Sequence, residues 1–158
     1  MLDTAVYTGI LKNLKRFLKT RDRTSEEVRS FLVLKGYEPD LILEFLETAK
    51  ETHLLDDSRV LQNLLDLQLQ TRKSGPQKIS NYLRERGFSD STIFSAVSNL
   101  PKEQIRKNCN DWLEKRLGGK SPSRSELGTC ILFLLSKGFE EEMILSCLRE
   151  KGISPEME

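Results

Sequence analysis

Histidine and cysteine are scarce in this sequence, which has His53 as its one histidine and Cys109, Cys130 and Cys147 as its three cysteines. The cysteines form no C-x-x-C pair, so neither a disulfide framework nor a cysteine–histidine metal site is expected. Gly118-Gly119-Lys120-Ser121 matches only the end of a phosphate-binding loop and lacks its first glycine. We therefore expect no enzymatic activity, no metal and no cofactor.

Long hydrophobic runs are also absent. The longest purely apolar run extends from Cys130 to Leu135, far short of the ~20 residues that a membrane-spanning helix needs. The first residues do not combine a basic stretch with an apolar one, so no signal peptide is expected. The free cysteines suit a reducing compartment. We expect a cytoplasmic protein without membrane contact.

An internal repeat is the most informative feature that the sequence does contain. Gly36, Gly87 and Gly138 are separated by two equal steps of 51 residues. The columns around them also match, with Phe31, Tyr82 and Phe133 five residues before each glycine, Leu32, Leu83 and Leu134 four before, Lys35, Arg86 and Lys137 one before, Tyr37, Phe88 and Phe139 one after, and Ile42, Ile93 and Ile144 six after. Repetition on this scale is typical of stacked supersecondary units.

The spacing of these columns predicts helices. Apolar positions eight, five and four residues before each glycine lie on one helical face, and the glycine suits the left-handed residue that ends a helix. A longer apolar helix precedes each pair, and no segment alternates as a strand would. The predicted fold is all-α, with three tandem three-helix repeats in an elongated, curved, solenoid-like arrangement. We place the repeats at residues 1–52, 53–101 and 102–158 and expect a monomer.

Several motifs together resemble the bacterial regulatory protein RecX family. Leu54-Leu55-Asp56-Asp57-Ser58-Arg59 is similar to the family's G-L-L-D-D-x-R-F, with His53 in place of the glycine. The segment from Gly75-Pro76 to Gly87 fits G-P-x-x-I-x-x-x-L-x-x-[KR]-G, and residues 133–139 fit the C-terminal pattern. The resemblance covers roughly residues 10 to 150.

The resemblance implies a function as well as a fold. Members of this family bind the RecA recombinase, usually as a filament on single-stranded DNA, and lie in its helical groove. They damp its ATPase, strand-exchange and coprotease activities, have no active site or cofactor of their own, and belong to DNA repair, recombination and the SOS response. Some also bind DNA directly.

Charge is segregated although Lys and Arg total 25 against 24 Asp and Glu. Residues 1–25 hold six basic and two acidic side chains, residues 71–87 five and one, and residues 38–57 one and seven. We therefore predict a basic edge that could approach a partner or DNA phosphates, and an acidic edge. The candidate partner- or DNA-binding residues are Arg21, Arg23, Arg72, Lys73, Lys78 and Arg124.

Structural roles compete with binding roles at several positions. Charged side chains near helix ends are often solvated residues that complement the helix dipole. Asp56 and Asp57 suit a helix N-cap better than a metal site, because no further ligands accompany them. The aromatic residues after the glycines and Trp112 are expected in the core rather than as base-stacking anchors. A helical module that binds nucleic acid independently of RecA remains the alternative function.

Overall fold

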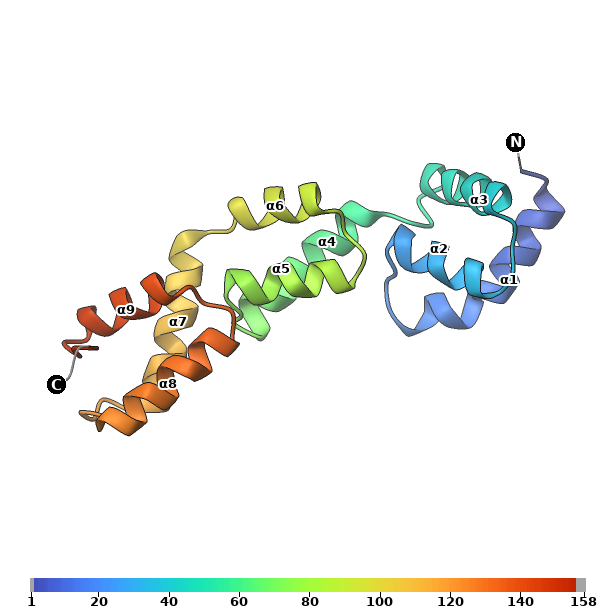
Figure 1. Cartoon of the computed structure of the whole chain (residues 1–158). Coiled ribbons are helices and arrows are strands. Elements are labelled where there is room, and N and C mark those ends of the chain that lie inside the picture. Colours follow the sequence, from blue (N-terminus) through green and yellow to red (C-terminus); the bar gives the residue numbers. More distant parts are fainter. Residues whose placement is uncertain (1, 156–158) are drawn as a thin grey trace. The chain divides into compact units, whose positions relative to one another are not determined.

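The computed structural model describes residues 2–155, and within them the chain is helical and contains no strand. The elements are α1 (Thr4–Thr20), α2 (Ser25–Leu34), α3 (Pro39–Glu51), α4 (Asp57–Asp66), a π-helical turn η1 (Leu67–Thr71), α5 (Pro76–Glu85), α6 (Asp90–Ser98), α7 (Lys102–Leu117), α8 (Arg124–Ser136) and α9 (Glu141–Glu150) (Figure 1). The predicted all-α class is confirmed. No helix in the described range is long and apolar enough to cross a membrane.

The chain forms two compact units. The first contains the residues up to Asn63 together with Arg86–Phe88, and the second contains Leu64–Glu85 and the residues from Ser89 onward. The boundary therefore falls within α4 and again just after α5. The three repeat boundaries predicted from the sequence remain a prediction.

The core of the first unit is formed by α1, α2 and α3 with the turn that follows them. Its buried members are apolar residues at helical spacing, namely Ile10, Leu14, Val28, Leu32, Ile42, Phe45, Leu46, Ala49 and Leu55. Burying such side chains contributes about 1.5–3 kcal/mol each relative to leaving them in water. Val6, another apolar residue of α1, lies outside this core and is 39% exposed.

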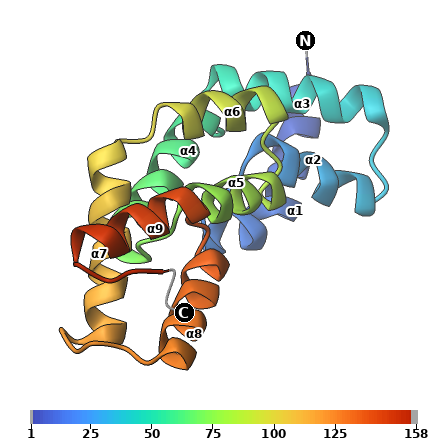
Figure 2. The same ribbon diagram turned by 60° about the vertical axis from the view of Figure 1, so that its left-hand side comes forward.

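The second unit is organised around α7, which packs against η1, α8 and α9 (Figure 2). Ile105, Cys109 and Leu113 are four residues apart and form the buried face of α7. Asn108 is also fully buried, and its side-chain amide donates to the Leu69 carbonyl at 2.9 Å. This hydrogen bond ties α7 to the π-helical turn, which the sequence pattern did not indicate.

The repeated glycines have the conformation that the sequence predicts. Gly36, Gly87 and Gly138 have φ angles of 89°, 91° and 93°. After α2, the Tyr37 amide donates to Leu32 O, and after α8, the Phe139 amide donates to Leu134 O, both at 3.2 Å. These bonds are those of a Schellman cap, so the columns around the glycines mark true helix ends.

A hydrogen bond to the carbonyl that precedes two of these glycines recurs at the repeat spacing, donated by a side chain in one copy and by the backbone in the other. In the first unit, Thr24 Oγ1 donates to the Arg86 carbonyl at 2.8 Å. In the second unit, the Gly75 amide donates to the Lys137 carbonyl, also at 2.8 Å. Both partners in the second contact lie 51 residues after their counterparts in the first. The repeat is therefore visible in tertiary contacts as well as in the sequence.

Candidate functional site

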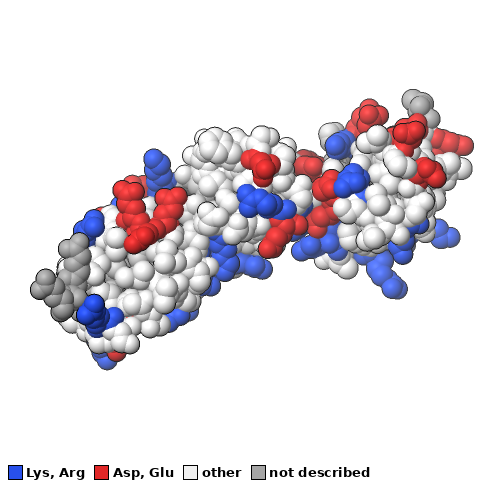
Figure 3. All heavy atoms as spheres, viewed as in Figure 1, with Lys and Arg blue, Asp and Glu red and all other residues white. Residues whose placement is uncertain are grey.

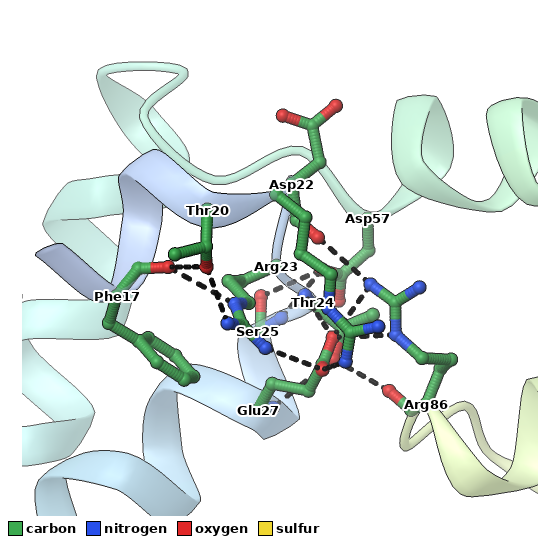
Figure 4. A network of polar contacts seen from close by, with 10 residues as sticks. Phe17, Thr20, Asp22, Arg23, Thr24, Ser25, Glu27, Asp57 and Arg86 are labelled. Carbon is green, nitrogen blue, oxygen red and sulfur yellow. Dashed lines mark hydrogen bonds and ion pairs between the residues drawn. The ribbon is translucent and has the colours of Figure 1, made fainter.

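A partly buried polar network occupies the start of α2 in the first unit (Figure 4). Glu27 lies at its centre and forms ion pairs with Arg21 at 3.1 Å, Arg23 at 3.5 Å and Arg86 at 3.0 Å. Arg86 also donates to the Asp22 carbonyl at 2.8 Å, and its side chain is only 7% exposed. Arg86, which the sequence suggested as a surface cation at a helix end, is instead a structural residue.

Electrostatics explain why the network stays charged. Burial alone raises the pKa of Glu27, but the Thr24 amide and the guanidiniums of Arg86 and Arg21 outweigh it and hold that pKa below its usual value. The guanidinium carbon of Arg23 lies over the Phe17 ring, 3.8 Å from its centroid, and Arg23 Nε donates to the Phe17 carbonyl. Arg23 is therefore committed to intramolecular contacts.

The two adjacent aspartates act as helix caps. Asp56 accepts from the Arg59 amide at 3.1 Å, as an N-cap of α4 does. Asp57 accepts from the amide of Ser25 at 2.8 Å and from its hydroxyl at 3.1 Å, at the start of α2. The described residues contain no group of three or more side chains that could hold a metal ion.

The other predicted binding residues lie in the second unit. Arg72 and Arg124 are exposed, and the guanidinium of Arg72 lies 5.8 Å from the Tyr82 ring. Lys73 forms an ion pair with Asp111 at 2.7 Å. Lys78 is half-buried at the start of α5, where its backbone approaches Gly138. The predicted candidates are therefore divided between the two units.

A cluster of cations and aromatic rings lies on α7 and α8, and the sequence analysis missed it. The Trp112 and Phe133 rings meet edge to face at 5.3 Å. The guanidinium of Arg116 lies 3.6 Å from the Phe133 centroid, and the ammonium of Lys137 lies 4.6 Å from the indole. Lys115 approaches the indole at 5.4 Å. We call these five residues the Trp112–Phe133 cluster.

The repeat columns mark one ring of this cluster, Phe133, which lies five residues before Gly138. The aromatic five residues before each glycine carries a nearby cation in all three copies, with Lys35 at 5.4 Å from Phe31, Arg72 near Tyr82, and Arg116 and Lys137 near Phe133. Cation–aromatic contacts of this kind contribute about 0.5–1 kcal/mol at exposed sites. Only Lys35 and Lys137 belong to the basic column before the glycines, whereas Arg72 and Arg116 come from other positions, so the columns alone do not indicate these contacts.

Acidic side chains collect elsewhere in each unit. They gather over α3 in the first unit and over α9 in the second (Figure 3). Within the second unit, Phe94 is 75% exposed and borders a groove of about 800 Å³ that also receives Ile93, Val97 and Met143. The second unit thus presents an apolar groove, an acidic helix and a basic aromatic cluster.

The described residues thus form an all-helical protein whose surface carries segregated charge and an apolar groove. No family model matches the chain. Curated relatives named Regulatory protein RecX match it at 30% identity in Halalkalibacterium halodurans, over 90% of the chain and 54% of the relative, and at 28% in Clostridium botulinum strain Alaska E43, over 89% and 65%. The chain therefore spans between about half and two thirds of the length of these relatives.

Solved structures agree with the fold. The crystal structure of RecX from Lactobacillus salivarius superposes with a TM-score of 0.78 at 22% identity, covering 92% of this chain and 94% of that one. A second crystal structure, of a regulatory protein RecX, gives a TM-score of 0.73 at 18% identity, covering 91% and 71%. The chain is thus similar in sequence to proteins named Regulatory protein RecX, and the solved structures show that it has the fold of RecX.

Proposed function

We propose that this chain is a non-enzymatic regulator of RecA that binds the RecA filament on single-stranded DNA. The proposal is based on the match to proteins named Regulatory protein RecX over about nine tenths of the chain. The direction of regulation is inhibition, mainly of ATP hydrolysis, strand exchange and coprotease activity. The protein acts by contact, in the cytoplasm and as a monomer.

The exposed basic residues provide the contact in this proposal. Arg72 and Arg124 are exposed, and neither forms an ion pair with another described residue. Arg23, by contrast, is held by Phe17, Thr20 and Glu27. A free surface cation can meet an acidic partner or a phosphate without first breaking an internal pair. Arg72 and Arg124 are therefore the first residues to test.

The test is ATP hydrolysis by RecA on single-stranded DNA, titrated with this protein at two salt concentrations. Inhibition near one protein per RecA subunit or below supports the proposal. Arg72→Glu reverses one charge on the proposed contact and should raise the concentration needed for half-inhibition by about tenfold. The reason is that like charges facing each other across an interface cost on the order of a kcal/mol or more of binding free energy. An absence of inhibition at saturating protein would overturn the proposal.

Arg149→Glu is the matched control. Arg149 is also exposed and near a helix end, but it lies in α9 beside acidic residues and was not predicted to bind a partner. The Arg149→Glu variant should inhibit RecA as strongly as the unaltered protein does. The alternative function, nucleic-acid binding that acts without RecA, predicts a different result: the protein would protect single-stranded DNA even from an unrelated DNA-dependent ATPase.

A further inference from the structure

Two contacts in the structure join the start of one helix to the end of the equivalent helix in the next repeat. In the first unit, Thr24 at the start of α2 donates to the Arg86 carbonyl after α5, and Glu27 forms an ion pair with the Arg86 guanidinium at 3.0 Å. In the second unit, Gly75 at the start of α5 donates to the Lys137 carbonyl after α8. In both contacts the acceptor belongs to the basic residue that precedes a left-handed glycine.

The end of α2 has the same form but no such partner. Lys35 and Gly36 follow α2 as Arg86 and Gly87 follow α5, and Lys35 is exposed. No described residue donates a hydrogen bond to the Lys35 carbonyl, and its side chain forms no ion pair with one. A Cβ at Gly36 would meet no described atom within 4 Å, whereas one at Gly87 would meet the Glu26 side chain at 2.8 Å. We call Lys35 and Gly36 the acceptor end.

The start of α8 is a matching helix start that is also unused. Ser123 and Glu126 form a capping box there, as Thr24 and Glu27 do in α2. The Ser123 hydroxyl accepts from the Glu126 amide but donates to no described residue, and Glu126 forms no ion pair within the described part of the chain. Both residues are exposed, whereas Thr24 is 1% exposed beneath its contact. We call Ser123 and Glu126 the donor end.

We propose that copies of this chain associate head to tail, with the donor end of one copy on the acceptor end of the next. The Ser123 hydroxyl would donate to the Lys35 carbonyl, as Thr24 donates to its acceptor within the chain. The Glu126 carboxylate would pair with the Lys35 ammonium and so repeat the ion pair of Glu27. A second copy is the occupant that these ends select, because they complement each other in charge and in hydrogen bonding.

This association is weaker than the contact within the chain. Asp57 strengthens the internal contact by accepting from the Ser25 amide at 2.8 Å and from its hydroxyl at 3.1 Å. The residue 51 positions before Asp57 is Val6, whose side chain cannot accept a hydrogen bond. Separate copies also lack the covalent connection that gives the internal contact a high effective concentration. The chain is therefore monomeric when dilute and associates when it is concentrated.

The first experiment is sedimentation velocity of the full chain over a wide range of protein concentration. Because the two ends differ, each pair of copies keeps one free donor end and one free acceptor end. The weight-average sedimentation coefficient should therefore rise steadily with concentration, without a plateau at the dimer. A coefficient that is independent of concentration would overturn the proposal.

Two charge reversals test the ends themselves. Lys35→Glu and Glu126→Lys each place like charges across the contact, and each should lower the association constant by about tenfold or more. An equal mixture of the two variants should associate again, because every contact between unlike variants joins opposite charges. Failure of the mixture to associate would overturn the proposal.

Matched controls separate the contact from general effects of charge and folding. Lys50→Glu and Glu142→Lys make the same changes at exposed positions of α3 and α9, outside both ends, and should leave association unchanged. Glu126→Gln removes the charge but keeps a residue that completes a capping box, so its association should still fall. Circular dichroism checks that every variant is folded. Equal losses in the controls and in the end variants would show that these ends are not the contact.

Cross-linking identifies the atoms in contact. A carbodiimide joins an amine to an adjacent carboxylate as an amide, with loss of water. In a mixture of isotopically labelled and unlabelled protein, we expect Lys35 of one copy to be joined to Glu126 of another, which mass spectrometry recognises by the mixed labels. A cross-link between these residues that never carries mixed labels would contradict the proposal. RecA is absent from every arm, so failure here and failure of the regulator proposal are distinguishable.

Discussion

His53 stands at a backbone position that glycine fills more easily. It follows α3 with a φ of 60°, and its amide donates to the Lys50 carbonyl at 3.1 Å. The RecX-like motif has glycine there, and the structure shows why. We expect His53→Gly to raise the free energy of unfolding of the first unit by about 0.5–1 kcal/mol, because relief of left-handed strain exceeds the added chain entropy. Urea unfolding measures this, and His53→Ala, which keeps the strain, should show no gain.

Glu27 makes part of the stability of the first unit dependent on pH. Its folded pKa lies below the usual value, so its contribution is complete above the unfolded pKa of about 4.3 and is lost as pH falls through the folded value. We expect Glu27→Gln to cost roughly 3 kcal/mol at pH 7, since Arg86 would remain buried without its carboxylate. The difference from the unaltered protein should shrink as the pH falls below the unfolded pKa of about 4.3. A difference that is constant over that range would show that charge is not what Glu27 contributes.

Residue-level prediction from the sequence succeeded where a role is local. A left-handed glycine, a capping aspartate such as Asp56 and a buried Leu32 each depend on neighbours within a few positions. Arg86 shows the limit, because its partner Glu27 lies 59 residues away. Nothing in the spacing of charges indicates which surface cation will meet a distant carboxylate.

At the scale of elements, Gly75 and Gly138 join the start of α5 to the end of α8. A Cβ on Gly138 would lie 2.3 Å from the Lys78 backbone nitrogen, and one on Gly75 would lie 2.4 Å from the Gly138 carbonyl carbon. Besides the Gly75 bond to Lys137, the Gln77 amide donates to the Gly138 carbonyl at 2.9 Å. Only glycine lets the two backbones approach this closely.

Alanine substitutions separate backbone strain from this close approach. Gly36 has a similar φ but nothing within 4 Å, so Gly36→Ala should cost about 1–2 kcal/mol from strain alone. Gly138→Ala adds a backbone clash and should cost at least twice as much. Gly128→Ala, inside α8 and unobstructed, should stabilise by about 0.5–1 kcal/mol. Thermal unfolding of the three variants tests the order, and equal losses at Gly36 and Gly138 would contradict it.

The sequence predicted the ends of helices more accurately than their interiors. The caps and glycines located the ends of α2, α5 and α8, because those signals are local. The π-helical turn at Leu67–Thr71 was not predicted, since apolar spacing alone does not distinguish it from a continued α-helix. The Trp112–Phe133 cluster was missed for a related reason: its members come from two helices whose approach depends on tertiary packing.

At the scale of the whole molecule, the side chains that can be followed by fluorescence or by thiol labelling lie in only one of the two units. Trp112 and the buried thiols of Cys109, Cys130 and Cys147 all belong to the second unit. Burial raises the pKa of each thiol. We expect a thiol reagent to leave all three unlabelled in the native protein and to label them together when the second unit opens, which mass spectrometry would show. Rapid labelling of one cysteine without the other two would contradict a single buried core there.

The same distribution allows the cooperativity of the molecule to be measured. Each unit buries its own apolar core, so each should unfold as a unit of its own. We expect the Trp112 emission, which reports the second unit, and the helical circular dichroism, which reports both, to give urea transitions that do not coincide. His53→Gly should then move part of the dichroism transition and leave the tryptophan midpoint unchanged. If both probes coincide and His53→Gly shifts them equally, the chain unfolds as one cooperative structure, and a partner bound to either unit would stabilise the whole molecule.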